Sequence, residues 1–527
     1  MKFFFTYIVF FLALNLQSQS KYAVELVDKS SDRVEDYIQH PEEMLSQRSI
    51  DRRIDQNIHL DSKDVPIDPL LIQECINTGA EVLSSSKWLN ILYVSAGEEQ
   101  RAQLEKLSFV KSVTALQESV MSKAVEDQAY LPAKKSSSIY GLSDDFIKQI
   151  RVDYLHDKGY TGKNIQIAVF DTGFPGVDIL EEFKEVGVKG SYNFVEGATD
   201  VYKNNYHGTM VLSTMGVNKP GTYVGSAYEA DYWLFTTEDI NSETPLEEFN
   251  WIEAAEYADS VGADVINSSV GYYDYESPYI SYAYEDMDGK TTHISKGATI
   301  AASRGILVVV SAGNEGNKDW NYIVTPSDAV DVLAVGAVDK YGIAAPFTSY
   351  GPSSDGRIKP DISAMGVSVP VFNEYGEIKT LNGTSFSSPI TAGSLACLRQ
   401  AFPGASVKAI IEVLHSTASL DGNTDDRLGY GIANFEQAYL ELEKSLSQVE
   451  DELIGLKILP NPVKEILKVR GLDDKKYIYS ICDSSGRMVL SGSDNLNNGI
   501  DLSILKKGYY QLIILNGNTK INLGFIK

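Results

Sequence analysis

The stretch IQIAVFDTG, residues Ile165–Gly173, decides the fold, because a nearly unbroken apolar run ends directly in the carboxylate of Asp171. A strand without alternation between apolar and polar side chains is buried on both faces, as the strands of a parallel sheet are. Similar short runs recur along the chain at Asp231–Phe235, Val265–Ser269, Ile306–Val310 and Val332–Val338. Helix-prone segments, among them Leu246–Ser260 and Ser387–Ala401, separate these runs. Residues 142–442 are therefore predicted to form an α/β domain with a parallel sheet covered by helices on both faces.

Three side chains of this region have complementary acid–base chemistry. Asp171 ends a predicted strand, His207 lies in YHGT at residues 206–209, and Ser385 lies in NGTSFSSP at residues 382–389. A serine hydroxyl needs a base to remove its proton during attack, and a neutral imidazole can take that proton and return it to a leaving amine. A carboxylate fixes the imidazole tautomer and stabilises the imidazolium. The sequence thus predicts Ser385 as nucleophile, His207 as base and Asp171 as the orienting group.

Other assignments of these residues have less support. Asp-Thr-Gly is also found in aspartic proteases, but their paired carboxylates need a second copy of the motif, and the chain has none. Of the six histidines, only His207 is followed by Gly-Thr. A lone histidine or a lone turn serine is most often structural. The prediction therefore rests on the joint occurrence of the motifs in one order.

A fourth motif, SAGNEG at residues 311–316, follows the strand predicted at Ile306–Val310. Its amide side chain, Asn314, can donate a hydrogen bond to the oxyanion of a tetrahedral intermediate, and the backbone N–H of Ser385 is the natural second donor. Gly208 and Gly383 permit close backbone approach beside the reacting atoms.

The motifs DTG, HGT, SAGNEG and NGTSFSSP, in this order, resemble those of the subtilisin-like serine proteases over about residues 142–442. The resemblance implies a parallel seven-stranded sheet flanked by helices, and hydrolysis of peptide bonds through an acyl-enzyme. It also implies that Asp171, His207 and Ser385 are the catalytic triad and that Asn314 is the oxyanion donor. The residues that it implies for substrate binding are Ser269, Val270, Gly271, Ser311, Ala312 and Gly313.

Residues 1–20 have the features of a cleaved signal peptide: Lys2, an apolar run over Phe3–Leu14, and small residues at Ser18 and Ser20. The apolar run is too short to span a bilayer comfortably, so a membrane anchor is the weaker alternative. An exported protein is expected.

Two segments separate the signal peptide from the α/β domain. Residues 21–117 alternate strand-like and helix-like patterns, which predicts a small α+β unit similar to the family's inhibitory propeptide. Residues 118–141 form a polar link that is predicted to be exposed and easily cut. Lys134-Lys135 is either a processing site or ordinary charge of the link, and the sequence favours neither.

Residues 456–527 return to short strands separated by Asn, Gly and Asp turns, which predicts a small β-sandwich-like domain. Three elements, LPNP at 459–462, DSSGR at 483–487 and LKKGYY at 505–510, resemble the sorting domain of type IX secretion in Bacteroidetes. The resemblance implies contact with the secretion machinery, passage through the outer membrane, and a secreted or cell-surface location.

The composition limits which other classes of protein and site are possible. The chain has 527 residues, 43% of them hydrophobic, and its 72 acidic against 46 basic residues give a formal net charge of −26. This charge opposes binding to phosphate backbones and anionic membranes, so nucleic acid is not an expected partner. The three cysteines, Cys75, Cys397 and Cys482, form no CxxC pair, so neither a disulfide framework nor a thiolate zinc site is expected.

We interpret the chain as a secreted, monomeric subtilisin-like serine endopeptidase made as a zymogen, acting on protein or peptide substrates and inhibited by its own propeptide. The chemistry needs no cofactor or metal. The acidic segment Glu285–Gly289 is a candidate calcium loop or cleft rim, although its ligand spacing favours a solvated surface loop. Two alternatives remain open on the sequence alone: a non-catalytic surface protein on the same scaffold, and a peptide ligase that transfers the acyl group to an amine.

Overall fold

The computed structural model describes residues 20–116, 138–276, 279–420, 422–454, 456–483, 487–516 and 519–527. The predicted signal peptide, apart from Ser20, and most of the predicted link lie outside these residues. The chain divides into two compact units, one ending at Glu436 and one running from Gln437 to Lys527.

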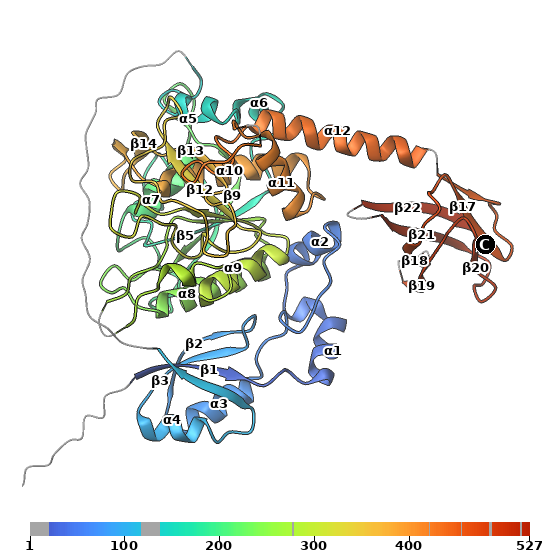
Figure 1. The fold of residues 1–527 in the computed structure, drawn as a ribbon, viewed down its shortest axis with the longest axis horizontal. Helices are drawn as coiled ribbons and strands as arrows, with labels where there is room; N and C mark the ends of the chain where they lie inside the picture. The colour runs from blue at the N-terminus through green and yellow to red at the C-terminus, as the bar shows by residue number, and fades with distance from the viewer. Residues whose placement is uncertain are drawn as a thin grey trace, which may run out of the picture. The chain divides into compact units, whose positions relative to one another are not determined.

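A seven-stranded parallel sheet forms the centre of the first unit, in the order β13-β12-β11-β10-β5-β9-β6 (Figure 1). Its strands are β5 (Gln166–Asp171), β6 (Gly187–Asn193), β9 (Asp231–Thr236), β10 (Val265–Ser268), β11 (Leu307–Ser311), β12 (Leu333–Val338) and β13 (Ile362–Met365). The predicted parallel sheet is confirmed. The sequence patterns missed β6 and β13, because β6 is a half-buried edge strand with two glycines and β13 has only four residues.

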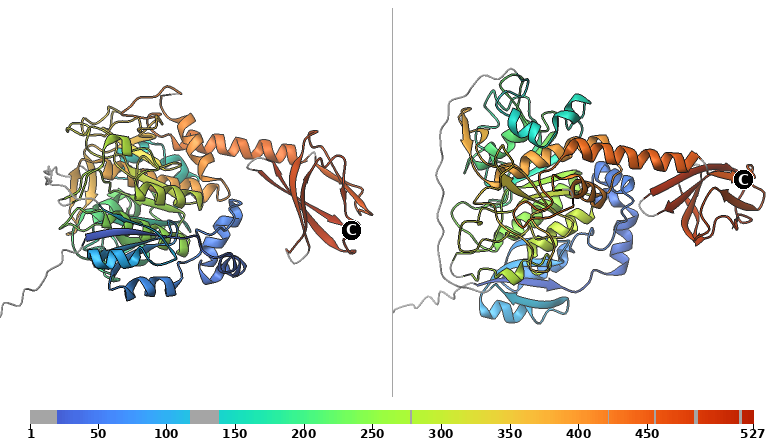
Figure 2. Two further views of the ribbon diagram at one scale, coloured as in Figure 1. Left: turned by 60° about the horizontal axis from the view of Figure 1, so that its bottom comes forward. Right: turned by 45° about the horizontal axis from the view of Figure 1, so that its top comes forward.

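Helices cover both faces of this sheet. The pair α8 (Leu246–Val261) and α9 (His293–Ser303) packs on one face, and the pair α7 (His207–Gly216) and α10 (Thr384–Ala401) packs on the other (Figures 1 and 2). Trp251 of α8 packs edge-on against Phe170 of β5, with ring centroids 5.3 Å apart, so large aromatic side chains fill the layer between helix and sheet.

The starts of two helices lie at candidate catalytic residues. The sequence predicted a helix over Ser387–Ala401, but α10 already begins at Thr384, and α7 begins at His207. Gly383 precedes α10 with φ +153°, a conformation that glycine adopts without strain. Both candidate catalytic side chains therefore belong to the first turn of a helix.

The N-terminal region, residues 20–116, forms its own small α+β layer within the first unit, as predicted. Its antiparallel strands have the order β2-β3-β1-β4, and two helices cover one face of the sheet. The elements are β1 (Ser20–Leu26), α1 (Ser31–Gln39), η1 (Pro41–Glu43), α2 (Gln47–Asp55), α3 (Pro69–Asn77), β2 (Glu81–Ser86), β3 (Ile91–Ala96), α4 (Glu98–Leu104) and β4 (Val110–Ala115). The other face of the sheet packs on α8, where Tyr93 stacks on Phe249 with ring centroids 4.3 Å apart.

The second unit has a separate core between a three-stranded and a four-stranded sheet, as expected for a sandwich. Its strands are β16 (Lys457–Leu459), β17 (Ile466–Arg470), β18 (Tyr477–Asp483), β19 (Met488–Asp494), β20 (Ile500–Asp501), β21 (Tyr509–Asn516) and β22 (Thr519–Ile526). The remaining elements of the chain are α5 (Asp144–Gln149), α6 (Asp153–Asp157), β7 (Asn218–Lys219), β8 (Tyr223–Val224), η2 (Tyr284–Asp286), β14 (Val369–Phe372), β15 (Ile378–Leu381), α11 (Val407–Thr417) and α12 (Phe435–Ile454).

Two general features of the described residues agree with the sequence. All three cysteines are free and buried, so no disulfide joins them. Among the helices formed by these residues, none combines the length and the apolar character that a membrane crossing needs.

Candidate active site

Asp171 and His207 meet at the carboxyl end of β5. Asp171 is the last residue of this central strand and is fully buried. Its Oδ1 accepts hydrogen bonds from the N–H of Thr172 at 2.8 Å and from the Thr172 hydroxyl at 3.1 Å. His207 Nδ1 lies 2.8 Å from Asp171 Oδ1 and 3.0 Å from Oδ2. When Nδ1–H donates to this carboxylate, Nε2 is the basic nitrogen of the neutral ring.

The start of α7 can approach the Asp-Thr-Gly turn because residue 208 is a glycine. A Cβ atom at Gly208 would lie 2.4 Å from the carbonyl oxygen of Gly173 and 3.0 Å from the Cβ of Asp171. A side chain here would therefore push His207 away from the carboxylate. The position after the histidine in the sequence motif therefore needs glycine for a steric reason.

Ser385 lies in the first turn of α10. Pro389, four residues further along, has no N–H, so the helix cannot donate its usual hydrogen bond to the carbonyl of Ser385. The hydroxyl of Ser269 donates to this carbonyl instead, at 3.0 Å, and the hydroxyl of Ser385 donates to the carbonyl of Ser269 at 3.3 Å. These two contacts hold the start of α10 against the end of β10.

Asn314 follows β11 and faces the same helix start. Its Oδ1 accepts hydrogen bonds from the N–H of Thr384 at 2.9 Å and from the Thr384 hydroxyl at 3.0 Å. Because both contacts use the carbonyl oxygen, the amide Nδ2 is left as a donor, and it has no partner among the described residues. Thr384 was not singled out in the sequence, although it stands next to Ser385 in the motif.

The structure brings Ser385 and His207 to one edge of the sheet without a hydrogen bond between them in the described part of the chain. The ring of His207 lies beside that of Phe386, the residue after Ser385, with 5.9 Å between the ring centroids. The Ser385 hydroxyl is engaged by Ser269. Hydrogen bonds of this kind are often long or misaligned before a substrate binds.

The charge of Asp171 controls the titration of His207. Burial lowers the pKa of His207, but the negative charge of Asp171 and its hydrogen bond outweigh burial and hold this pKa above its ordinary value. The imidazolium form is therefore stabilised, which is the property that a general base needs after it has taken a proton.

A second carboxyl group lies close to this pair. Glu238 follows β9, whose Thr236 pairs in register with Asp171, and its Oε1 accepts a hydrogen bond from the hydroxyl of Tyr272. Burial, together with the negative charge of Glu243, raises the pKa of Glu238 to about 8. At neutral pH this carboxyl is mostly protonated, so it adds little negative charge beside Asp171. No periodic pattern or motif in the sequence indicates this contact.

The residues expected to bind the substrate backbone lie at two neighbouring strand ends. Ser269 follows β10 directly, and within the described ranges Val270 and Gly271 form no backbone hydrogen bond. This edge is open to an extended peptide. Gly313, with φ +108°, turns the chain after the neighbouring strand β11.

Two of the predicted substrate residues lie deeper. Ser311 is the last residue of β11, and Ala312 is fully buried, with its N–H donating to the carbonyl of Val335 at 3.0 Å. These two residues directly precede Gly313 and hold the chain that leads into its turn.

The candidate calcium loop, residues 285–289, uses its carboxylates on its own backbone. Asp286 Oδ2 accepts a backbone N–H at 2.9 Å, and Asp288 Oδ1 accepts the N–H groups of Lys290 and Thr291, each at 2.7 Å. The described residues contain no group of three or more His, Cys, Asp or Glu side chains placed to hold a metal ion.

Three family comparisons cover most of the chain. Residues 162–431 match the Subtilase family, residues 21–130 match the Peptidase S8 propeptide domain of Bacteroidota, and residues 457–527 match the Secretion system C-terminal sorting domain. Individual proteins agree with the family match. The chain is 30% identical to subtilisin NAT of Bacillus subtilis subsp. natto over 364 residues, 68% of this chain and 87% of that protein.

A second relative and a solved structure extend the comparison. The chain is 26% identical to the alkaline protease of Alkalihalobacillus alcalophilus over 374 residues, 69% of this chain and 89% of that protein. The crystal structure of MycP1 with the N-terminal propeptide removed is 23% identical, covers 56% of this chain and 96% of that chain, and has a TM-score of 0.47.

The chain belongs to the subtilase family. It is a serine endopeptidase that hydrolyses peptide bonds and is made as a zymogen with an N-terminal propeptide. Its C-terminal domain is the sorting domain of type IX secretion, which directs the protein to the cell surface or the exterior. The predicted enzyme class, zymogen organisation and export are confirmed.

Proposed function

We propose that Ser385 is the nucleophile of this peptidase, that His207 is its general base and then its general acid, and that Asp171 orients His207. The observation that supports this proposal most strongly is the contact of both Asp171 oxygens with His207 Nδ1, at 2.8 and 3.0 Å. This contact fixes one tautomer and leaves Nε2 basic.

In the proposed mechanism, the Ser385 hydroxyl turns from the carbonyl of Ser269 toward His207 Nε2 when a peptide binds. Nε2 removes the hydroxyl proton while Oγ attacks the scissile carbonyl, and Asp171 stabilises the imidazolium. The ring then donates the proton to the leaving amine as the peptide bond breaks, which leaves an acyl group on Ser385. A water molecule, deprotonated by His207 in the same way, attacks this ester. The bond between the acyl carbon and Oγ then breaks, the acid leaves, and His207 returns the proton to Ser385.

Asn314 stabilises the oxyanion in both attacks. Its Nδ2 and the N–H of Ser385 donate to the developing negative charge, and Thr384 holds the amide in the required orientation through Oδ1. The substrate backbone pairs with the open edge at Ser269–Gly271. The polar side chains and backbone groups of the site supply every proton transfer, so this chemistry needs no cofactor.

Replacement of the nucleophile tests the proposal. Ser385→Ala is expected to abolish peptide hydrolysis and covalent labelling by a fluorophosphonate, and to leave the precursor unprocessed. Ser387→Ala is the matched control, since this serine lies in the same helix turn but its hydroxyl donates to the carbonyl of Thr384 at 3.1 Å. Retained hydrolysis in Ser385→Ala would reject the assignment. Failure of the processed wild-type enzyme to take the label would favour a non-catalytic scaffold.

Calcium and oligomeric state belong to the same proposal. We expect a monomer with no nucleic acid partner, and the candidate segment for a structural calcium ion is 285–289, although its ligand spacing favours a solvated surface loop. Thermal unfolding with and without a chelator tests the ion: a lower Tm that added Ca²⁺ restores supports it, and an unchanged Tm rejects it.

A further inference from the structure

The propeptide carries a helical arm, residues 31–64, whose described side chains lie outside the propeptide's own hydrophobic core. The arm comprises α1, η1 and α2 and connects β1 to α3. The core beneath the propeptide sheet draws on β1, β3, α3 and α4, with Ile67 as the first contributor after the arm. The arm packs against the ends of α8 and α9 instead (Figures 1 and 2).

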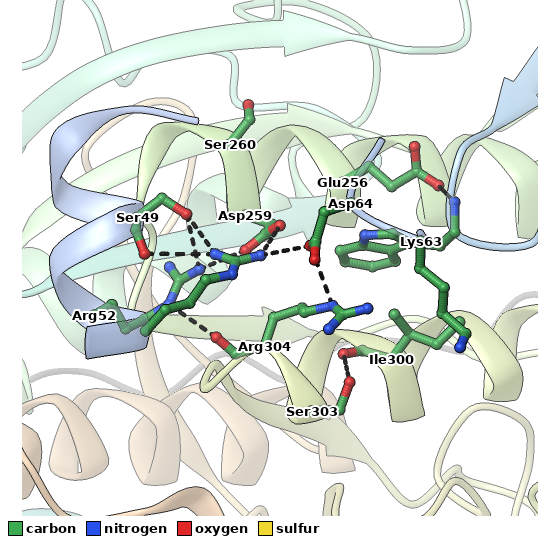
Figure 3. Close-up of polar contacts among 12 residues, drawn as sticks. Ser49, Arg52, Lys63, Asp64, Glu256, Asp259, Ser260, Ile300, Ser303 and Arg304 are labelled. Carbon is green, nitrogen blue, oxygen red and sulfur yellow. Dashed lines mark hydrogen bonds and ion pairs between the residues drawn. The ribbon is translucent and has the colours of Figure 1, made fainter. Parts of the chain in front are cut away.

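Two buried arginines of the arm bind one buried carboxylate of the enzyme. Arg52 and Arg53 on α2 are 6% and 2% exposed, and Asp259 on α8 is fully buried. Arg53 Nη2 lies 2.8 Å from Asp259 Oδ2. Arg52 donates to Oδ1 of the same carboxylate, and Figure 3 labels both of these residues. Burial raises the pKa of Asp259, but the charges of the two arginines outweigh burial and lower it, so the carboxylate is ionised in the complex.

A second ion pair crosses the interface in the opposite direction. Arg304, which follows α9 in the enzyme, is 3% exposed and points back toward the arm (Figure 3). Its Nη2 lies 2.8 Å from Asp61 Oδ1, and its Nε lies 3.4 Å from Asp64 Oδ1. Asp64 also accepts a hydrogen bond from Arg53 at 2.9 Å, so it bridges the two arginines. Each side of the contact supplies both signs of charge.

The arm also satisfies carbonyl groups at the carboxyl ends of both enzyme helices. The end of a helix leaves carbonyls unpaired at the negative pole of its dipole, where a guanidinium group is favoured. The donors are Arg48 Nε at 2.9 Å, Arg52 Nε at 3.2 Å and Gln56 Nε2 at 2.9 Å, with a further bond from Arg52 Nη1. The acceptors are the carbonyls of Gly262, Ala263, Arg304 and Gly305.

All these contacts lie at the opposite end of the sheet from the active site. Gly262 and Ala263 lead into the amino end of β10, and Gly305 leads into the amino end of β11. The candidate active site lies at the opposite edge, where Asp171 ends β5 and Asn314 follows β11, both parallel to β10. The arm therefore holds the propeptide without entering the cleft.

We propose that the arm is a second anchor of the propeptide, in addition to the sheet that packs on α8. Asp259, Arg304 and the ends of α8 and α9 form a docking site on the enzyme. Its occupant is α2 of the arm, which binds through Arg48, Arg52 and Arg53. This site retains the propeptide on the enzyme after the link between them has been cut. Its strength comes from charges that are buried as pairs, because loss of one partner leaves the other buried and unpaired.

The test measures release of the propeptide in an inactive chain. The full chain carries Ser385→Ala, and a recognition sequence for an unrelated site-specific protease is inserted between residues 117 and 137. After this link is cut, the dissociation rate of the propeptide from the immobilised enzyme is measured. Intact mass reports any self-cleavage, so a failure of the proposed triad appears separately from a failure of the anchor.

Five variants, one of them the single Arg53→Met chain, separate the anchor from a general effect. Arg52→Met with Arg53→Met is expected to speed dissociation by about 100-fold or more. Arg33→Met is the matched control at wild-type rate, since this arginine also lies on the arm but contacts only propeptide groups. Asp259→Asn is expected to speed dissociation from the enzyme side. Combined with Arg53→Met, its effect should be far smaller than the product of the two single effects, because both substitutions remove the same Arg53–Asp259 contact.

The outcomes are distinct. An unchanged rate in the Arg52→Met, Arg53→Met chain, or full multiplication of the Asp259→Asn and Arg53→Met effects, would overturn the second anchor. If the methionine variant does not fold, the lysine variant of both positions takes its place, with an increase of about tenfold expected because charge is kept and the planar fork is lost. Hydrogen exchange of the backbone amides is also compared between the uncut Arg52→Met, Arg53→Met chain and the uncut parent chain. Faster exchange in the variant, confined to the ends of α8 and α9, supports the anchor. Unchanged exchange there argues against it.

Discussion

A histidine whose Nδ1 lies against both oxygens of a buried carboxylate has one favourable tautomer and one favourable ring orientation. His207 is held in this way, and its side chain remains partly exposed, while its Nε2 has no hydrogen-bond partner among the described residues. The geometry of the pair is thus set before any substrate arrives. Two predictions at the scale of single residues follow from the contacts around His207 and Asn314.

Asp171→Asn should lower kcat by about 10⁴-fold, because the amide favours the wrong tautomer of His207. It should also move the acid limb of the kcat/KM profile to lower pH. His207 must be neutral to accept a proton, so activity rises with pH through its pKa, and Asp171 raises that pKa. Glu238→Gln is the control: this carboxyl, with a pKa of about 8, is already mostly neutral below that pH, and its limb should not move. Equal shifts in both variants would contradict the specific role of Asp171.

Asn314→Ala should lower kcat by about 10²–10³-fold with a small change in KM, because the lost donor acts on the oxyanion and not on the bound substrate. Thr384→Val removes one of the two contacts that orient Asn314 and keeps the backbone one, so its effect should be smaller, about tenfold. Steady-state kinetics on one peptide substrate compares the two. A larger loss in Thr384→Val than in Asn314→Ala would reject the positioning role.

At the scale of elements, the start of α10 depends on a hydrogen bond from another strand. Pro389 removes the helical donor to the Ser385 carbonyl, and Ser269 replaces it at 3.0 Å. The proline therefore makes the first turn of the helix depend on the end of β10. This exchange of hydrogen bonds couples the proposed nucleophile, Ser385, to the strand end that we propose binds the substrate.

Ser269→Ala should lower the Tm of the first unit, because it leaves the Ser385 carbonyl without a partner at a cost of about 1–3 kcal/mol. For a unit of this size each kcal/mol corresponds to about 2–4 °C. In a chain that also carries Pro389→Ala, the restored N–H can bind the carbonyl, so the same change should cost less. Calorimetry of inactive precursors measures the cycle. Identical costs in both backgrounds would show that the serine acts elsewhere.

The sequence predicted the strands that carry a buried apolar run and the helices between them, because burial on both faces leaves a clear pattern. It missed β6 and β13, where half-burial or short length removes that pattern. The triad candidates were found because their motifs are local. Contacts such as Thr384 with Asn314, or Glu238 with Tyr272, join distant segments through single side chains and leave no periodic signal.

At the scale of the whole molecule, the two units have separate cores, and the core of the second draws only on residues from Leu456 onward. A chain that ends after Ile454 should therefore keep the unfolding temperature of the first unit and its kcat/KM on a small peptide. It should fail to reach the cell exterior, because the sorting domain is lost. Fractionation of cells, together with activity measurements, checks both parts. A truncated chain that is exported normally would contradict the assignment of sorting to this unit.

The charge exchange between the arm and the enzyme also limits which propeptides can pair with this catalytic domain. Arg53 meets an anion of the enzyme, while Asp61 and Asp64 meet a cation of the enzyme. A homologous propeptide with these signs interchanged would place like charges opposite the buried Asp259 and Arg304, a mismatch that complementary contacts elsewhere cannot compensate. The interface thus discriminates between cognate and foreign segments through polarity, independently of any sequence preference in the cleft.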